Sequence, residues 1–265
     1  AMIPNPSAWA SEREPASTLR FAPPVIAHRG ASARAPENTL AALREAARCG
    51  CRWVEFDVKL SRDGVPILIH DERLERTTNG RGRVRDLTYD ELRRLDAGSW
   101  FHPRYAGEPI PTLAEAVALL LALDLTANIE IKPCPGRERQ TAELVALALR
   151  QLWPANRPPP LLSSFSQQAL VTLKEVAPEL PRGLLRASPG PNVQAALREL
   201  GCVSLHLDHK RVGLRKLREL VQSRIPVLLY TVNDVESACR LLAAGVAAIF
   251  TDIPDLLLER LARGQ

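Results

Sequence analysis

Two pairs of charged residues stand two positions apart inside apolar runs of the sequence. Glu55 and Asp57 lie in the run WVEFDVKL, and Glu130 and Lys132 lie in the run TANIEIK. Residues i and i+2 of a β-strand point to the same side, so each pair is expected to project together. A single carboxylate on a strand is as readily explained by an arginine across the sheet. Three carboxylates in apolar surroundings repel one another unless protons or a cation neutralise them, and together they favour a divalent cation at Glu55, Asp57 and Glu130.

The ligand chemistry of this predicted site limits the choice of metal. All three candidate ligands are carboxylates and no cysteine accompanies them. Hard cations prefer oxygen ligands, so we predict one divalent cation, Mg²⁺ or Ca²⁺, rather than zinc.

Two of the five histidines stand at the ends of apolar runs. His28 closes VIAH and precedes Arg29, and His70 closes VPILIH and precedes Asp71. Imidazole is the side chain best suited to move protons near neutral pH, and the adjacent arginine is suited to an anionic substrate. The other three histidines are expected to serve packing or the surface; they are His102, His206 and His209.

The order of elements expected around these residues is a strand followed by a helix, repeated eight times. Short apolar or β-branched runs cover 24–30, 53–60, 126–132, 160–165, 182–187, 202–208, 226–232 and 247–252. Between them apolar residues return every three or four positions, which is typical of amphipathic helices. We therefore predict an α/β fold, a (β/α)8 TIM barrel. An open doubly wound sheet is the alternative, but no GxGxxG follows the first strand.

One stretch interrupts the alternation after the second strand. Asp63-Gly64 is typical of a tight turn, so VPILIHD is expected to form a short hairpin with the preceding strand. Residues 72–111 have weak periodicity and are too long for a simple connection, which predicts a small insertion. The barrel domain then covers 25–265. Residues 1–24 carry five prolines and are expected to form a flexible arm, with Ala1 as a cloning remnant before Met2.

Composition excludes several classes of protein. The apolar run 116–123 is too short to span a bilayer, so no membrane span is expected. Five cysteines without a CxxC pair favour a reducing, cytoplasmic setting. A formal charge of +5 suggests nucleic acid, but the arginines are scattered and aromatic residues make up only 5%, so no nucleic-acid partner is predicted.

The C-terminal ends of the strands are where a barrel of this type builds its site. The polar residues expected at those ends are His28, Arg29, Glu55, Asp57, Glu130, Lys132, Ser164, Tyr230, Asn233 and Asp252. Of these, Ser164, Asn233 and Asp252 carry the weakest signal and are expected only to shape the rim. For Glu37, Asn38 and Thr39, an ordinary helix start and a phosphate contact are equally good explanations.

The sequence resembles the glycerophosphodiester phosphodiesterase family. The resemblance is carried by AHRGASARAPENTLAAL, VEFDVKLSRDGVPILIHD, NIEIK, YTVND and IFTDIPD, in this order from about Val25 to the C-terminus. It implies a TIM barrel with a small insertion after the second strand, a divalent cation at Glu55, Asp57 and Glu130, and catalytic histidines at His28 and His70. It also implies hydrolysis of a small-molecule glycerophosphodiester to sn-glycerol 3-phosphate and an alcohol. Tyr230 stands where the family often has tryptophan, at the expected glycerol contact.

Phosphodiester chemistry gives the remaining residues their expected roles. Arg29 and Lys132 would bind the substrate and stabilise charge on the phosphate oxygens. One histidine would take a proton from the nucleophile and the other would protonate the departing alkoxide. The nucleophile is either water or the substrate's own 2-hydroxyl, which we favour by resemblance to related two-histidine barrels. A phospholipase D-like or lysophospholipase D activity and a binding protein without catalysis are the alternatives, and no oligomeric state is predicted.

Overall fold

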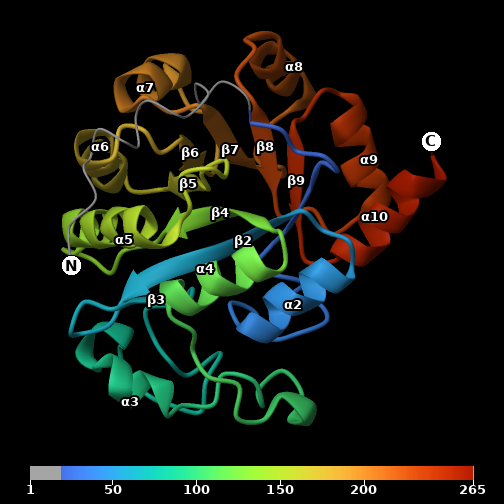
Figure 1. The fold of residues 1–265 in the computed structure, drawn as a ribbon. Coiled ribbons are helices and arrows are strands. Elements are labelled where there is room, and N and C mark those ends of the chain that lie inside the picture. Colours follow the sequence, from blue (N-terminus) through green and yellow to red (C-terminus); the bar gives the residue numbers. More distant parts are fainter. Residues whose placement is uncertain (1–18, 265) are drawn as a thin grey trace.

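Residues 19–264 are described by the structure, a computed structural model, and they form a closed barrel of eight parallel strands (Figure 1). The barrel strands are β1 (Val25–Ala27), β2 (Trp53–Leu60), β4 (Thr126–Ile131), β5 (Leu161–Ser164), β6 (Arg182–Arg186), β7 (Ser204–Asp208), β8 (Val227–Tyr230) and β9 (Ala248–Thr251). Each strand pairs with its neighbour along the chain, apart from the short β3, and β1 closes the ring by pairing with both β2 and β9. The predicted (β/α)8 TIM barrel is confirmed.

Helices follow the strands and form the outer ring, because parallel neighbours need a crossover connection. They are α2 (Leu40–Arg48), α4 (Leu113–Ala122), α5 (Glu138–Leu152), α6 (Gln167–Val176), α7 (Val193–Leu200), α8 (Leu214–Gln222), α9 (Val235–Ala243) and α10 (Pro254–Arg263). Within residues 19–264, no helix is long and apolar enough to cross a membrane.

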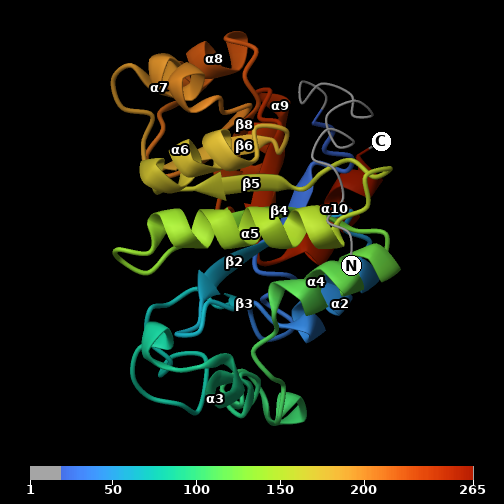
Figure 2. The ribbon, with the colours of Figure 1, turned by 60° about the vertical axis from the view of Figure 1, so that its left-hand side comes forward.

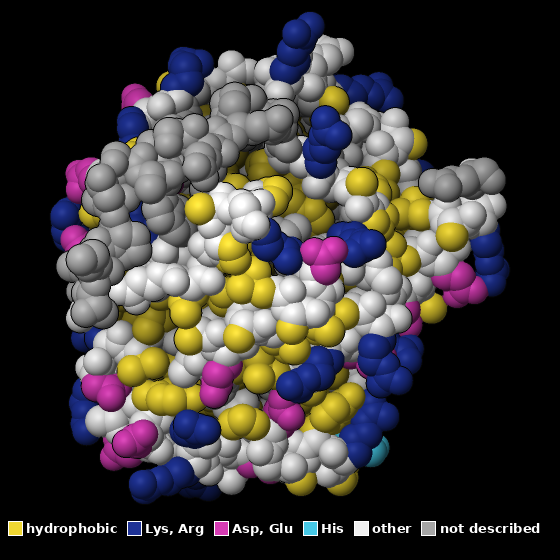
Figure 3. All heavy atoms as spheres, in the orientation of Figure 1, with side chains coloured by type: hydrophobic (Ala, Val, Ile, Leu, Met, Phe, Trp, Pro, Cys, Tyr) yellow, Lys and Arg dark blue, Asp and Glu magenta, His cyan; other side chains and the backbone are white. Residues whose placement is uncertain are grey.

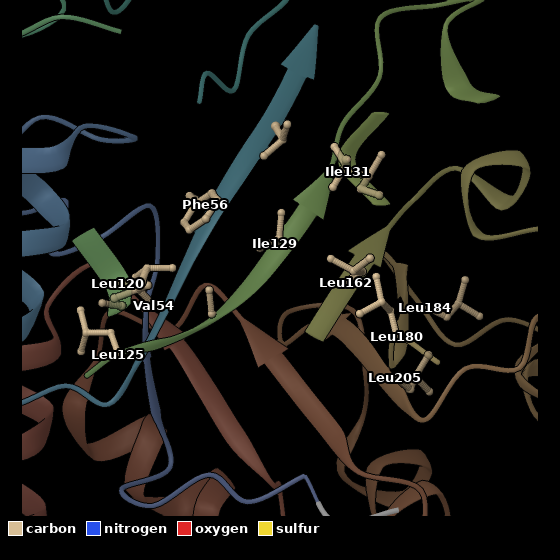
Figure 4. Packing of buried hydrophobic residues seen from close by; sticks show 14 of the residues in the cluster. Val54, Phe56, Leu120, Leu125, Ile129, Ile131, Leu162, Leu180, Leu184 and Leu205 are labelled. Atoms are coloured by element: carbon tan, nitrogen blue, oxygen red, sulfur yellow. The ribbon is translucent and has the colours of Figure 1, made fainter. Parts of the chain in front are cut away.

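Alternation along each strand divides its side chains between two environments. On β2, Val54 and Phe56 point outward and join the core between the strands and the helices, where Leu120 of α4 also packs (Figure 4). The residues that alternate with them along β2 are Trp53, Glu55 and Asp57, and they occupy the other face of the strand, toward the inside of the barrel. At the N-terminal ends of the strands this inner face is apolar, and Ile26 and Trp53 belong to one apolar cluster there. The polar inner residues therefore lie toward the C-terminal ends of the strands.

The segment after β2 begins with the expected hairpin. The strand β3 (Pro66–Leu68) pairs antiparallel with the end of β2, and Gly64 in the turn has a φ of 81°. Beyond β3 come η1 (Val84–Asp86), α3 (Tyr89–Arg93) and η2 (Pro103–Tyr105). This segment has its own small apolar cluster, which includes Leu74 and Leu92. It lies beside α2 and α4 in both ribbon views (Figures 1 and 2).

The start of the described chain packs against the barrel. Phe21 contacts Trp53 with ring centroids 4.6 Å apart, and the indole N–H of Trp53 donates to the carbonyl of Arg20. Leu19 and Phe21 thus cover the N-terminal end of the barrel, unlike the loose arm expected over 1–24. The first 18 residues of that expected arm lie outside the described residues.

Surface charges of both signs are interspersed. On the face drawn in Figure 3, Lys and Arg side chains alternate with Asp and Glu side chains and do not gather into one basic patch. Interspersed charges give this face no extended field of one sign.

Candidate active site

A cavity of about 340 Å³ opens at the C-terminal ends of the barrel strands. Seven of the eight residues singled out for metal, substrate or catalysis line it: His28, Arg29, Glu55, His70, Glu130, Lys132 and Tyr230. Asp57, the eighth, lies behind them and contacts Arg29. The cavity is completed by five residues that the sequence did not single out: Asn128, Phe165, Leu185, Thr231 and Phe250.

The three acidic residues meet at one point. Each of Glu55, Asp57 and Glu130 offers an oxygen, and the three oxygens lie within 4.8 Å of one another. Strand geometry explains this, because Glu55 and Asp57 share a face of β2 and Asp57 is the register partner of Glu130 on β4. The expected convergence of the three carboxylates is what the register produces.

Burial makes the acid cluster electrostatically costly. Burial raises the pKa of Glu55 well above its usual value, and the charges of Asp57 and Glu130 raise it further. Burial and the charge of Asp57 raise the pKa of Glu130 to about 7. Burial also opposes ionisation of Asp57, but nearby cations, Arg29 first, outweigh it and lower its pKa to about 2. Asp57 is therefore ionised, whereas Glu55 and Glu130 keep their protons to higher pH than ordinary carboxyls do, as expected where positive charge is lacking.

The cluster has the properties of a site for a hard cation. Oε1 of Glu55 is buried and has no hydrogen-bond partner among the described residues. A buried carboxylate oxygen without a partner is unfavourable, and a divalent cation would satisfy it and the raised pKa values together. Glu55, Asp57 and Glu130 therefore fit such an ion.

Asn38 fixes the orientation of Asp57. Its side-chain N–H donates to Oδ2 of Asp57 at 2.9 Å, and its side-chain oxygen accepts from the backbone N–H of Asp57 at 3.0 Å. Asn38 has a φ of 56°, which an asparagine adopts more readily than most residues. Thr39, the next residue, caps α2 by accepting from the N–H of Ala42. The segment is thus a helix start at Thr39, and Asn38 serves the acid cluster.

His28 is held by Asp252 from the last strand. Nδ1 of His28 lies 2.7 Å from Oδ1 of Asp252, and Asn233 and Ser32 also donate to this carboxylate. Burial opposes ionisation of Asp252, but His28, Asn233 and Ser32 together outweigh it and lower its pKa to about 2. An ionised carboxylate only accepts hydrogen bonds, so Nδ1 of His28 carries the proton. Nε2 of His28 is then left toward the acid cluster, 3.9 Å from Glu55.

His70 is held in the same way by its neighbour in sequence. Its Nδ1 lies 2.6 Å from Oδ1 of Asp71. Two N–H groups of Arg76 donate to Asp71 and, with burial opposing, keep the pKa of that carboxyl well below its usual range. Burial lowers the pKa of His70 itself, with its acidic neighbours opposing, so the neutral imidazole is favoured near pH 7. Both imidazoles therefore have an occupied Nδ1.

Two cations lie beside the acids. The Nε of Arg29 lies 3.3 Å from Asp57, and the backbone N–H of Arg29 donates to Glu55. Nζ of Lys132 donates to Oε1 of Glu130 at 3.1 Å and lies 5.5 Å from the centroid of the Phe165 ring. An anion entering the cavity meets both positive groups.

Other residues predicted at the rim have structural partners. The hydroxyl of Tyr230 donates to the carbonyl of Arg186, so its ring rather than its hydroxyl faces the cavity. Ser164 is buried and donates to the carbonyl of Ile131. His206 is buried in the barrel, and burial lowers its pKa to about 3, while His102 is exposed in the segment after β3. These histidines are packing and surface residues, as expected.

Sequence reasoning undervalued the residues that hold the histidines and acids. Asp252 and Asn38 were assigned only weak or ambiguous roles, and Arg76 and Phe165 none. Phe165 directly follows β5, so its place at a strand end was the available signal. Arg76 acts through contacts between loops, and Asn38 reaches Asp57 on β2 from a loop, so residue spacing gives no signal for either.

Comparison with known proteins identifies related sequences and structures. A family model described as "Glycerophosphoryl diester phosphodiesterase family" matches residues 28–256. A glycerophosphodiester phosphodiesterase of Caldanaerobacter subterraneus is 36% identical over 244 residues, covering 91% of this chain and 98% of the relative. One from Bacillus subtilis is 35% identical over 251 residues, covering 88% of this chain and 84% of the relative. An Oleispira antarctica phosphodiesterase, solved in complex with the product sn-glycerol-3-phosphate, superposes with a TM-score of 0.88 at 39% identity over 90% of this chain and 96% of its own.

Proposed function

The chain belongs to the glycerophosphoryl diester phosphodiesterase family, and from this premise we propose that it hydrolyses glycerophosphodiesters to sn-glycerol 3-phosphate and an alcohol with one divalent cation and two histidines. The observation that carries the mechanism is the shared cavity. It is lined by two imidazoles, each with a carboxylate at Nδ1, and by two of the three clustered acids.

The proposed cation is Mg²⁺ or Ca²⁺, held by Glu55, Asp57 and Glu130. When bound, it would draw electron density from a phosphate oxygen and balance the charge of the acids. The buried oxygen of Glu55 and the raised pKa of Glu130 support this assignment.

The two histidines divide the proton transfers. One of His28 and His70 takes the proton of the attacking hydroxyl through Nε2, and an oxygen–phosphorus bond forms. The bond from phosphorus to the leaving oxygen breaks, and the other histidine donates its proton to that oxygen. Asp252 and Asp71 stabilise the imidazolium that forms in each half of the exchange. We favour the glycerol 2-hydroxyl as nucleophile, with water then opening the cyclic phosphate.

Arg29 and Lys132 are proposed to bind the phosphate. Both are positively charged near neutral pH and line the cavity, where Arg29 contacts Asp57 and Lys132 contacts Glu130. Charge grows on the phosphate oxygens in the transition state, where fixed cations stabilise it most. The ring of Tyr230 would then pack against the organic part of the substrate.

A lysophospholipase D-like activity is the second candidate. Phe165 is 47% exposed at the cavity and packs edge-on against Tyr230. An exposed aromatic ring at the mouth would favour an apolar leaving group. Trp100, Phe101 and Tyr105, the aromatic cluster of the segment after β3, pack on one another instead. Comparing glycerophosphocholine with lysophosphatidylcholine separates the two substrates.

The proposed setting is a reducing compartment such as the cytoplasm. All five cysteines are free thiols, and Cys51 and Cys134 are buried. The proposed partner is the small-molecule substrate alone.

The central test combines chelation with histidine variants. EDTA is expected to abolish hydrolysis of glycerophosphocholine, and added Mg²⁺ or Ca²⁺ to restore it. His28→Ala and His70→Ala should each lose about 10²- to 10⁴-fold in kcat, because each removes one proton transfer. The exposed His102→Ala is the matched control and should retain full activity. A fully active double variant, or hydrolysis indifferent to EDTA, contradicts the proposal.

A further inference from the structure

Arg76 lies in the segment after β3 and makes four hydrogen bonds to two carboxylates. Its Nε and Nη2 donate to Asp71 at 2.7 and 2.9 Å. Its Nη1 and Nη2 donate to Glu37 at 2.9 and 2.8 Å. Both pairs are two-pronged, which is the geometry in which a planar guanidinium binds a carboxylate most strongly.

Each of these carboxylates holds a residue of the proposed site. Oδ1 of Asp71 accepts from Nδ1 of His70, and Oε1 of Glu37 accepts from Arg29 at 2.8 Å. Arg76 therefore joins the loop after β3 to the loop after β1, although 39 residues separate it from Glu37.

The two carboxylates depend on Arg76 for their closeness. Asp71 and Glu37 both accept from Nη2 of Arg76, so their oxygens lie near each other. Like charges at such a distance repel unless a cation lies between them. Arg29 donates to the same oxygen of Glu37 as Nη2 of Arg76 does, and it also pairs with Asp57, but among the described contacts it makes no bond to Asp71. Without Arg76, these hydrogen bonds between the loop carrying His70 and the loop carrying Arg29 are lost.

We infer that Arg76 is a positioning residue for the reaction. By hydrogen-bonding to both Asp71 and Glu37, it sets the separation between His70 and the phosphate-binding Arg29. The segment after β3 thereby contributes to the site through Arg76, which does not line the cavity. This inference rests on the roles proposed above for His70 and Arg29.

The test compares three variants with glycerophosphocholine as substrate. Arg76→Met keeps the bulk but removes all four donors, and kcat should fall by about a hundredfold, as for a catalytic group misplaced by an ångström. Arg76→Lys keeps the charge but not the planar fork, and should recover less than about a tenth of the lost kcat. Arg73→Met is the matched control, because Arg73 pairs only with Glu75 among described acids. It should retain full activity.

Two further measurements separate positioning from a merely structural role. Methylguanidinium added to Arg76→Ala should restore kcat several-fold, and it should leave His70→Ala unchanged. Adding Glu37→Gln to Arg76→Met should cost much less than Glu37→Gln costs alone, because the same link is already broken. Thermal unfolding checks that each variant is folded.

The outcomes keep this inference distinct from the proposed function. Inactive His70→Ala with fully active Arg76→Met overturns the positioning role and leaves the two-histidine mechanism standing. Fully active His70→Ala overturns both. The positioning role is also contradicted if Arg76→Lys has the same kcat as the unaltered enzyme. It is contradicted as well if the losses caused by Arg76→Met and Glu37→Gln are additive in the double variant.

Discussion

At the scale of residues, the site depends on carboxylates that bind imidazoles. His28 and His70 each have Nδ1 engaged by an acid, so the proposed reacting atom in both is Nε2. A neutral imidazole has one donor and one acceptor nitrogen, and the bond at one nitrogen decides which it is at the other. Asp252 and Asp71 thereby fix both tautomer and ring orientation.

Replacing Asp252 by asparagine tests this directly. The amide of Asp252→Asn can donate to Nδ1 of His28, which would put the proton on Nε2 and leave His28 unable to accept a proton from the cavity or to form a stabilised imidazolium. We expect kcat to fall by up to about 10⁴-fold, the loss found when a carboxylate that orients a catalytic histidine is replaced by its amide. Steady-state kinetics measure the loss. Asp234→Asn is the control, because Asp234 caps α9 and is exposed. Equal activities of the two variants would refute the orienting role.

At the scale of elements, the position of helix α2 is set by one glycine. Gly30 follows His28 and Arg29 and has a φ of 80°, and its N–H approaches the carbonyl oxygens of Ala27 and Glu55. A Cβ at Gly30 would lie 2.6 Å from the backbone carbon of Ala42 in α2. This close approach brings the start of α2, and with it Asn38, to the acid cluster.

Alanine variants of two glycines, Gly30 beside α2 and Gly50 just after it, separate the cost of backbone strain from the cost of steric crowding. Gly50, just after the helix, also has positive φ (89°), but a Cβ there meets nothing within 4 Å. Gly50→Ala should lose about 1–2 kcal/mol of unfolding free energy from the left-handed conformation alone, with full activity. Gly30→Ala should lose a further ~1–3 kcal/mol from overpacking and should also lose activity, because Asn38 shifts. Urea unfolding and kinetics test both variants. Indistinguishable variants would contradict the crowding argument.

The sequence was most informative about the positions of the strands and helices. Apolar alternation and glycine punctuation are local properties, so the eight strands and the hairpin at Asp63-Gly64 followed from them. That Glu55 and Asp57 share one face of β2 followed from the two-residue period of a strand. By contrast, the bond between His28 and Asp252 spans 224 residues, and neither loop has a periodic pattern. The contacts of Arg76 with Asp71 and Glu37 are missed for the same reason, and Asn38 reaches Asp57 from a loop that has no periodic pattern.

At the scale of the whole molecule, closure of the barrel is what brings these groups together. Pairing of β1 with β9 places the end of the last strand beside the first, and so Asp252 beside His28. Pairing of β2 with β4 places Asp57 beside Glu130. The folded chain thus holds three carboxylates close together, at a cost in stability that the unfolded chain does not bear.

That cost makes both stability and metal affinity depend on pH. Folding raises the pKa of Glu130 from an ordinary value of about 4.5 to about 7. Between these two pH values the folded protein keeps the proton of Glu130, whereas the unfolded chain has released it. The metal-free protein should therefore lose stability as pH rises between about 4.5 and about 7. A divalent cation binds the ionised acids, so its affinity should rise by about tenfold or more per pH unit up to about pH 7, and less steeply above it while Glu55, whose pKa is also raised, still holds a proton.

Calorimetric titration with Mg²⁺ and with Ca²⁺ from about pH 5.5 to about pH 8, in two buffers of different ionisation enthalpy, measures affinity and proton release together. The gain in Tm on adding the ion should widen over the same pH range, because the ion relieves the repulsion that weakens the metal-free protein. Glu130→Gln should weaken binding and flatten its pH dependence, since no proton is left to displace there. Glu143→Gln, in an exposed ion pair on α5, is the control and should match the unaltered protein. Affinity that stays constant across this range, with no proton released, would mean that the carboxylates of β2 and β4 do not hold the ion.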